Sequence, residues 1–213
     1  TFIRNCKINQ PDGYGHMIYN DNGKYTGNFK NGSRHGKGKM IYPDNTLFKK
    51  SKISVDKDLY ILEYIGEWIN NQMSGRGKIT FSNAQYVGEM RNDKMNFYGI
   101  IRYDNGDKYY GNWEDNVYHD EGTKIYNNNT KYVGWWRDDL FFVRGKFYYA
   151  NGDTYEGGWE FGKRVGFGKI TYNNGNILYG KFSNGFFGNG IYNMTDLFHF
   201  FQVLKYWIYC ITN

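Results

Sequence analysis

The sequence predicts an all-β protein: an elongated antiparallel sheet built from consecutive β-hairpins. Three observations predict this fold. A pattern of tyrosine, glycine and aromatic residues recurs along the chain with a constant spacing, which is typical of repeat architectures. Apolar and polar residues alternate within each repeat, as in strands that have one apolar face. Asn-Gly pairs stand between the alternating stretches, and Asn-Gly supplies the positive φ that tight hairpin turns need.

The repeat is clearest at Tyr86, Tyr109, Tyr132 and Tyr155, which stand 23 residues apart. Counted from such a tyrosine as position zero, glycines recur at +2 and +13, and aromatic or apolar residues recur at +4 and +17. Units begin at Phe2, Tyr25, Tyr64, Tyr86, Tyr109, Tyr132, Tyr155 and Leu178, of which the first and last are degenerate. Domain counting therefore does not apply to residues 1–192, which form one repeat array.

Each unit is predicted to be one hairpin. Positions zero, +2 and +4 share a parity, as do +13, +15 and +17, so in strands each set points to one face. The glycines are expected to leave room for neighbouring rings to lie flat across the backbone. An insertion at about 48–63, FKKSKISVDKDLYILE, separates the units at Tyr25 and Tyr64 and is predicted to extend one hairpin.

Composition favours strands and turns over helices, because Gly, Tyr, Phe and Trp are abundant and only 2 of the 213 residues are proline. Cys6 and Cys210 are expected to lie far apart in an elongated array, which argues against a disulfide between them. The sequence contains no signal segment and no apolar stretch long enough to span a membrane. A cytoplasmic protein is the resulting expectation.

Two stretches, YTGNFKNGSRHGKGKMIY from position 25 and YEGGWEFGKRVGFGKITYNNG from position 155, resemble the MORN repeat (membrane occupation and recognition nexus). The resemblance extends over residues 2–192. Asn71, Asp93, Asn116 and Asp139 replace the turn glycine of that pattern, and this is interpreted as structural drift.

The resemblance implies a non-enzymatic scaffold that links protein partners at cytoskeletal structures, axonemal ones included, or at membrane-apposed structures. In this hypothesis a partner segment lies in a groove floored by aromatic rings, and association into homo-oligomers is a second mode. The aromatic groove would be formed by Tyr64, Trp68, Tyr109, Trp113, Tyr132, Trp136, Tyr155 and Trp159.

Two alternative functions remain open. Residues 1–52 hold 10 Lys and Arg against 3 Asp and Glu, so this end of the chain is basic. A peripheral module that binds anionic phospholipids such as phosphoinositides is therefore one alternative, at about 1 kcal/mol per basic residue near a membrane. The candidate patch for lipid or an acidic partner comprises Lys37, Lys39, Lys49, Lys50 and Lys52. The other alternative, implied by the family resemblance, is the regulatory region of a larger enzyme complex.

No catalytic, metal or cofactor site is predicted. The segment Gly157 to Lys163 matches G-x-x-x-x-G-K, but Arg164 follows where a phosphate-binding loop needs Ser or Thr. The four histidines form no pair at ligand spacing, and no Cys-x-x-Cys occurs. Nucleic acid is not an expected partner, because the aromatic residues share the packed face instead of alternating with lysines.

The last segment, residues 193–213, breaks the repeat. Thr195 is suited to cap a helix, and apolar residues recur at helical spacing after it. The apolar positions are Leu197, Phe201, Leu204, Ile208 and Ile211. This short helix would cover the open end of the sheet, or it would dock into a partner or a membrane interface.

Overall fold

The computed structural model describes residues 2–3, 6–7, 10–43, 46–48 and 59–188. Its strands are β1 (Phe2–Ile3), β2 (Cys6–Lys7), β3 (Gln10–Pro11), β4 (Gly13–Ile18), β5 (Lys24–Lys30), β6 (Ser33–Ile41), β7 (Leu47–Phe48), β8 (Leu59–Ile69), β9 (Gln72–Phe81), β10 (Ala84–Arg91), β11 (Lys94–Tyr103), β12 (Lys108–Glu114), β13 (Val117–Ile125), β14 (Lys131–Arg137), β15 (Leu140–Tyr148), β16 (Thr154–Glu160), β17 (Lys163–Thr171), β18 (Ile177–Ser183) and β19 (Phe186–Phe187).

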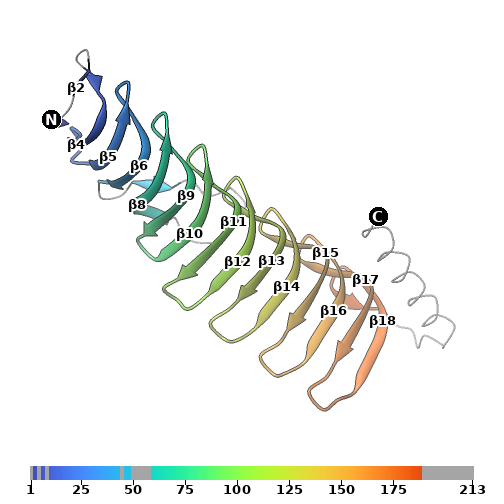
Figure 1. Ribbon diagram of the computed structural model, residues 1–213. Helices are drawn as coiled ribbons and strands as arrows, with labels where there is room; N and C mark the ends of the chain where they lie inside the picture. The colour runs from blue at the N-terminus through green and yellow to red at the C-terminus, as the bar shows by residue number, and fades with distance from the viewer. Residues whose placement is uncertain (1, 4–5, 8–9, 44–45, 49–58, 189–213) are drawn as a thin grey trace.

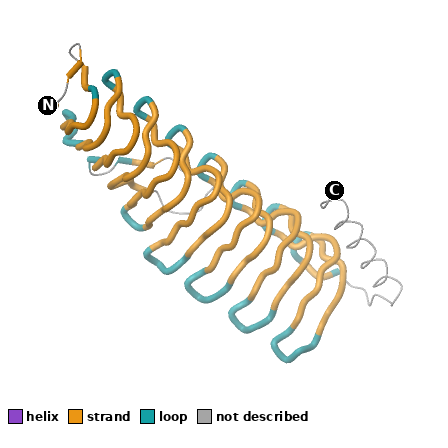
Figure 2. The backbone as a smooth tube through the Cα atoms, in the orientation of Figure 1, coloured by secondary structure: helices purple, strands orange, loops and turns teal. Residues whose placement is uncertain are grey.

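Seventeen of these strands form one antiparallel sheet. From β4 to β19 they pair in chain order, with β7 placed beside the start of β8. The curved hairpins stand side by side along one axis, with β4 and β18 at opposite ends (Figure 1, Figure 2). The predicted all-β antiparallel sheet is confirmed. The described part of the chain contains no helix, and the predicted C-terminal helix falls at 193–213, outside the described residues.

A continuous row of glycines crosses the sheet. Gly15 lies opposite Gly27, Gly27 opposite Gly38, and Gly38 opposite Gly66, and the row continues to Gly180 with one glycine from every strand between β4 and β18 except β7. Within a repeat, the tyrosine ring covers its pair of glycines. A Cβ placed on Gly122 would lie 2.3 Å from the Tyr109 hydroxyl, so no larger residue fits without displacing the ring. The predicted role of these glycines is confirmed.

Hydrogen bonds fix each ring in place. The Tyr109 hydroxyl donates to the Asn112 carbonyl at 2.7 Å, and five other repeat tyrosines bond the carbonyl three residues ahead in the same way. Three residues of straight strand span about 10 Å, so this bond requires the strand to bend towards the ring. The Trp136 Nε1–H donates to the Gly122 carbonyl of the preceding repeat at 3.1 Å. Tyrosines thus bend the hairpins, and tryptophans join them.

The turn inside each repeat has two successive residues at positive φ, such as Asn31 (48°) and Gly32 (80°). Asp139 (φ 65°) keeps this conformation without glycine, and its Oδ1 accepts a hydrogen bond from the Tyr118 N–H at 2.7 Å. Asn71, Asp93 and Asn116 make the same contact with the preceding repeat. The interpretation of these four residues as structural drift is therefore wrong, because their side chains join neighbouring repeats where glycine cannot.

A bulge in the second strand of each repeat was not predicted. The residue at +11 has positive φ, whether it is Gly75 (69°), Phe97 (55°) or Val143 (55°). The strand pairing shifts there, for example between Gly88 and Glu89. Bulges of this kind bend a strand and increase its twist, so they add to the curvature of the hairpins.

The two ends of the insertion after β6 form a strand pair, with Leu47 opposite Tyr60 and Phe48 opposite Leu59. Residues 49–58 lie outside the described residues. The sheet itself continues without a gap, because β6 pairs directly with β8.

Burial raises the pKa of the repeat tyrosines above the ordinary value of about 10. This holds for Tyr25, Tyr64, Tyr86, Tyr109, Tyr132 and Tyr155. At Tyr109 the carboxylates of Asp139 and Asp120 raise the pKa further, whereas Arg34 and Arg164 partly offset the effect of burial at Tyr25 and Tyr155.

Adjacent tryptophans on opposite faces of β14 give a direct test of the packed face. Trp136 is buried and Trp135 is half-buried. We expect Trp136→Ala to lower the free energy of unfolding by about 3–5 kcal/mol, as for other buried rings, and Trp135→Ala to cost much less. Urea denaturation of the two variants measures the difference, and equal losses would show that the faces are assigned wrongly.

The glycine row can be tested at one position. Gly122→Ala should destabilise the protein, since the new methyl group collides with the Tyr109 ring. Glu121→Ala, one residue earlier, is the control because its side chain is exposed on the other face of β13. A Gly122→Ala melting temperature equal to that of the parent protein would contradict the proposed contact.

Tyrosine ionisation should be coupled to unfolding. The folded-state pKa values are raised, so the neutral hydroxyls stabilise the fold below pH of about 10, and this contribution is lost as the pH rises further. We expect the absorbance of core tyrosinate to appear together with the loss of the sheet signal in circular dichroism. Ionisation of the six repeat tyrosines within an intact sheet would refute the burial argument.

Candidate functional site

The aromatic residues predicted to floor a groove form the core of the protein instead. Their exposed fractions run from 0% for Tyr64 to 6% for Trp159. Neighbouring repeats bring these rings together edge to face; Tyr109 lies 5.2 Å from Trp113 and 5.5 Å from Trp136, measured between ring centroids. The rings hold successive hairpins together and leave almost no surface for a partner to contact.

The opposite face of the sheet, here called the open face, carries the residues that alternate with these tyrosines and glycines. Strand pairing places one such residue per strand in a single row along the molecule. The row runs His16, Thr26, Lys39, Ile65, Lys78, Val87, Ile100, Tyr110, Thr123, Val133, Lys146, Glu156, Lys169, Tyr179. Sequence reasoning missed this row, although the offsets +1 and +14 would have revealed it.

The middle of the row carries no charge. We call Val87, Ile100, Tyr110, Thr123 and Val133 the central stripe. Val87 is 48% exposed, and Tyr110 and Val133 are each 39% exposed. With strands about 4.8 Å apart, the stripe is about 19 Å long. Within the stripe Ile100 is half-buried and Thr123 is buried, so its exposed apolar surface comes from Val87, Tyr110 and Val133. Exposed apolar patches often mark an interaction surface.

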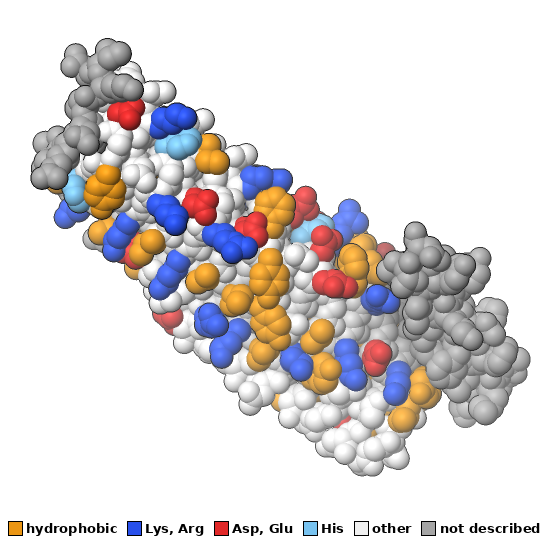
Figure 3. All heavy atoms as spheres, viewed as in Figure 1, with side chains coloured by type: hydrophobic (Ala, Val, Ile, Leu, Met, Phe, Trp, Pro, Cys, Tyr) orange, Lys and Arg blue, Asp and Glu red, His pale blue; other side chains and the backbone are white. Residues whose placement is uncertain are grey.

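Cations border the central stripe. Lys78 precedes it in the row, and Arg102 and Lys108 lie opposite each other in the next row of the same face. No carboxylate pairs with these three side chains within the part of the chain that the structure describes. The space-filling view shows apolar side chains along the molecule with lysines and arginines beside them (Figure 3).

The predicted basic patch is only partly described. Lys37 and Lys39 both project from the open face of β6, and Lys39 forms an ion pair with Glu63. Lys49, Lys50 and Lys52 lie outside the described residues, as do Leu197, Phe201, Leu204, Ile208 and Ile211 of the predicted docking tail.

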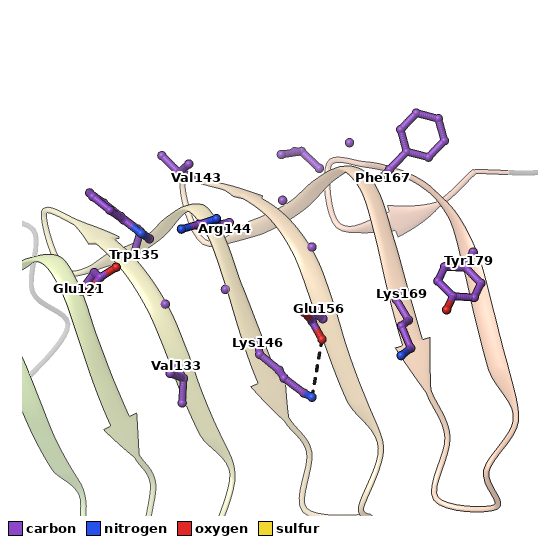
Figure 4. Close-up of a pocket in the computed structure, with 16 residues that line it drawn as sticks. Glu121, Val133, Trp135, Val143, Arg144, Lys146, Glu156, Phe167, Lys169 and Tyr179 are labelled. Atoms are coloured by element: carbon purple, nitrogen blue, oxygen red, sulfur yellow. Dashed lines mark ion pairs between the residues drawn. The ribbon is translucent and has the colours of Figure 1, made fainter. Parts of the chain in front are cut away.

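A groove of about 750 Å³ crosses the open face from β13 to β18 (Figure 4). We call it the C-terminal groove. The bare backbone of Gly134, Gly145 and Gly157 forms part of its lining. Trp135, Val143 and Phe167 line one side, and Val133, Lys146 and Lys169 line the other. Lys146 and Glu156 form an ion pair across it at 3.6 Å.

Among the described residues, no three His, Cys, Asp or Glu side chains gather as metal ligands. None of the described segments forms a helix with the length and apolar character that crossing a bilayer requires.

Part of the chain is similar to Alsin. Alsin from mouse (Mus musculus) is 24% identical over 146 residues, and human (Homo sapiens) Alsin has the same identity. The match covers 54% of this chain but 8% of Alsin, so the chain corresponds to a small part of those relatives.

A solved structure, the SAS-4 (dCPAP) TCP domain in complex with a proline-rich motif of Ana2 (dSTIL) of Drosophila melanogaster, aligns with 79% of this chain and 89% of that chain. Its sequence identity is 14% and its TM-score is 0.35.

A sequence model of the MORN repeat matches residues 7–24, 25–47, 64–84, 86–108, 109–131, 132–154 and 155–177. Six of these segments begin at the tyrosine that starts a repeat unit. The matched segments cover more than half of the chain, and the chain belongs to the MORN-repeat family.

Proposed function

We propose that this chain is a non-enzymatic scaffold that holds a protein partner along its open face. The central stripe carries this proposal, because it is an uncharged row about 19 Å long with cations at its border, in which Val87, Tyr110 and Val133 are exposed. A scaffold needs a surface that keeps its shape, and the packed aromatic face supplies that stiffness from behind.

The chemistry of the stripe defines the partner. Apolar side chains of the partner would cover Val87, Tyr110 and Val133, and this burial would contribute about 25 cal/mol for each Å² of apolar surface removed from water. Acidic residues beside them would meet Arg102 and Lys108. Charges at the rim of an interface mainly raise the association rate and select between partners. The expected partner segment is therefore apolar in the middle and acidic at its flank.

The location of the scaffold follows from the family alone. The MORN family resemblance favours a cytoplasmic protein at cytoskeletal structures, axonemal ones included, or at membrane-apposed structures. In Alsin the matching region is a small part of a longer protein, which favours a module that works within a larger assembly, including the regulatory region of an enzyme complex.

Binding to anionic phospholipid is the second candidate function. Lys37, Lys78, Arg102 and Lys108 share the open face, and within the described residues no carboxylate pairs with them. Each basic residue near an anionic membrane contributes about 1 kcal/mol. A flat cationic face without an apolar stripe would suit this function better, so the protein partner remains our first proposal.

The stripe is tested by placing charge in it. Val87→Asp combined with Tyr110→Asp should abolish capture of the protein partner from an extract of the source cells, because both side chains are exposed and the core stays intact. Ile177→Asp is the matched control, since Ile177 is an equally exposed apolar residue of the open face. Retention of the same bound proteins by both variants would rule out the central stripe.

The lipid alternative has its own assay. Vesicles containing phosphoinositide are mixed with the parent protein, with the stripe variant and with Arg102→Glu combined with Lys108→Glu. Salt-sensitive binding that only the charge-reversed variant loses would favour lipid over a protein partner.

A further inference from the structure

Exposed apolar side chains recur once per repeat along the open-face row. In four consecutive repeats the residue after the repeat tyrosine is apolar and exposed: Ile65 (45%), Val87 (48%), Tyr110 (39%) and Val133 (39%). We call these four the apolar anchors. The strands between them carry Lys78, half-buried Ile100 and buried Thr123 in the same row. Successive anchors are therefore two strands apart, or about 9.6 Å.

This spacing distinguishes between the conformations that a bound segment can adopt. A polyproline II helix has three residues per turn and a rise of about 3.1 Å, so its side chains return to the same side after about 9.3 Å. In an extended strand they return after about 6.8 Å. In an α-helix the nearest match is seven residues, or about 10.5 Å. Over the three steps from Ile65 to Val133, polyproline II departs from the anchors by about 1 Å and the α-helix by about 3 Å.

The strands that carry the apolar anchors have no open edge to which a partner strand could be added. Each of β8, β10, β12 and β14 pairs with a strand on either side. A segment that crosses them must therefore satisfy its own backbone groups. Polyproline II meets this condition, because its N–H and C=O groups stay hydrated.

Two exposed tyrosines stand on either side of the glycine row in the middle of this surface. Tyr110 on β12 and Tyr98 on β11, which is 53% exposed, lie diagonally across the paired Gly99 and Gly111. The glycines carry no side chains, so a segment between the two rings can approach the backbone. Surfaces lined by aromatic rings are the usual binding sites of polyproline II segments.

Three cations beside the apolar anchors determine which other residues the segment needs. Lys78 lies in the same row, and Arg102 and Lys108 lie opposite each other in the next row, beside Tyr110. No carboxylate pairs with any of the three among the described residues. In each turn of polyproline II, one residue faces the anchors and two point sideways. Acidic residues at the sideways positions would meet these cations and help to fix the register.

We propose that the segment held by the open face is proline-rich and binds in the polyproline II conformation, with an apolar residue at every third position and acidic residues between them. About ten residues would span the distance of about 29 Å from Ile65 to Val133. Proline holds this conformation before binding and so reduces the conformational entropy lost on binding. This inference rests on the proposed function, because it specifies the partner of the same surface.

Peptide selection with the full chain as bait tests the proposal. A phage-displayed library of random peptides of about twelve residues, long enough to span all four anchors, is enriched for binding to the parent protein. It is then depleted on Val87→Asp combined with Tyr110→Asp. We expect the remaining peptides to be rich in proline, with apolar residues at every third position and acidic residues between them. Circular dichroism spectra that match the parent protein show that the bait variant is folded.

Fluorescence anisotropy with the most enriched peptide measures the part played by single anchors. Ile65→Asp and Val133→Asp should each weaken binding about tenfold or more, which corresponds to about 1.4 kcal/mol. Ile177→Asp is the matched control, because Ile177 is an equally exposed apolar residue of the open face outside the row, and it should bind like the parent protein. A peptide of the same composition with apolar residues at every fourth position should also bind about tenfold more weakly.

The competing outcomes are distinct. Stripe-dependent peptides whose apolar residues recur at alternating intervals of three and four would indicate a bound α-helix, and recurrence at every second position would indicate a strand. Either result overturns the polyproline II conformation and leaves the proposed function standing. Recovery of no peptide that distinguishes the parent protein from the double variant also overturns it, whereas the capture of the protein partner from cell extract decides the proposed function separately.

Discussion

The contact between a tyrosine ring and a pair of glycines governs this structure. Each ring lies across the backbone of two neighbouring strands, at a distance that a Cβ would not permit. The hydroxyl then bonds a carbonyl three residues ahead, and the strand bends to allow it. Since all six repeats that begin with a tyrosine make this contact, their hairpins bend at the same place. The sheet therefore stays regular over its whole length, and the tryptophan of one repeat finds the glycine carbonyl of the one before it.

This contact also divides the work between the two faces. A single-layer sheet has no second layer to cover it, so it must bury one face with its own side chains. The bend allows the aromatic rings to cover one another, so the stability of the fold comes mainly from the aromatic face and not from the open face. Substitutions there change binding chemistry at little cost in stability, which is consistent with a row that changes from basic to apolar and back along the molecule.

The fold was predictable because its signals are local and periodic. The parity of Tyr109, Gly111 and Trp113 identifies one face of a strand, and the constant spacing identifies hairpins of equal length. The prediction that the aromatic residues line a surface groove was wrong, because parity shows which residues share a face but not whether that face is buried. Sequence variation hid the bulge, because Phe97 and Val143 occupy the left-handed position that glycine occupies in other repeats, as at Gly36 and Gly166. The role of Asp139 depends on an N–H in another repeat, which spacing alone does not locate.

The register between neighbouring strands does not depend on how many residues connect them. Sixteen extra residues stand between the units that begin at Tyr25 and Tyr64, yet Lys39 still lies opposite Ile65 and Gly38 opposite Gly66. Distance along the open face is therefore counted in strands, and each strand adds a step of about 4.8 Å. The position of an open-face side chain along the molecule is therefore fixed by the number of strands before it. Loops can be lengthened without moving these side chains, whereas the loss of one hairpin would shift every later side chain by two strand spacings.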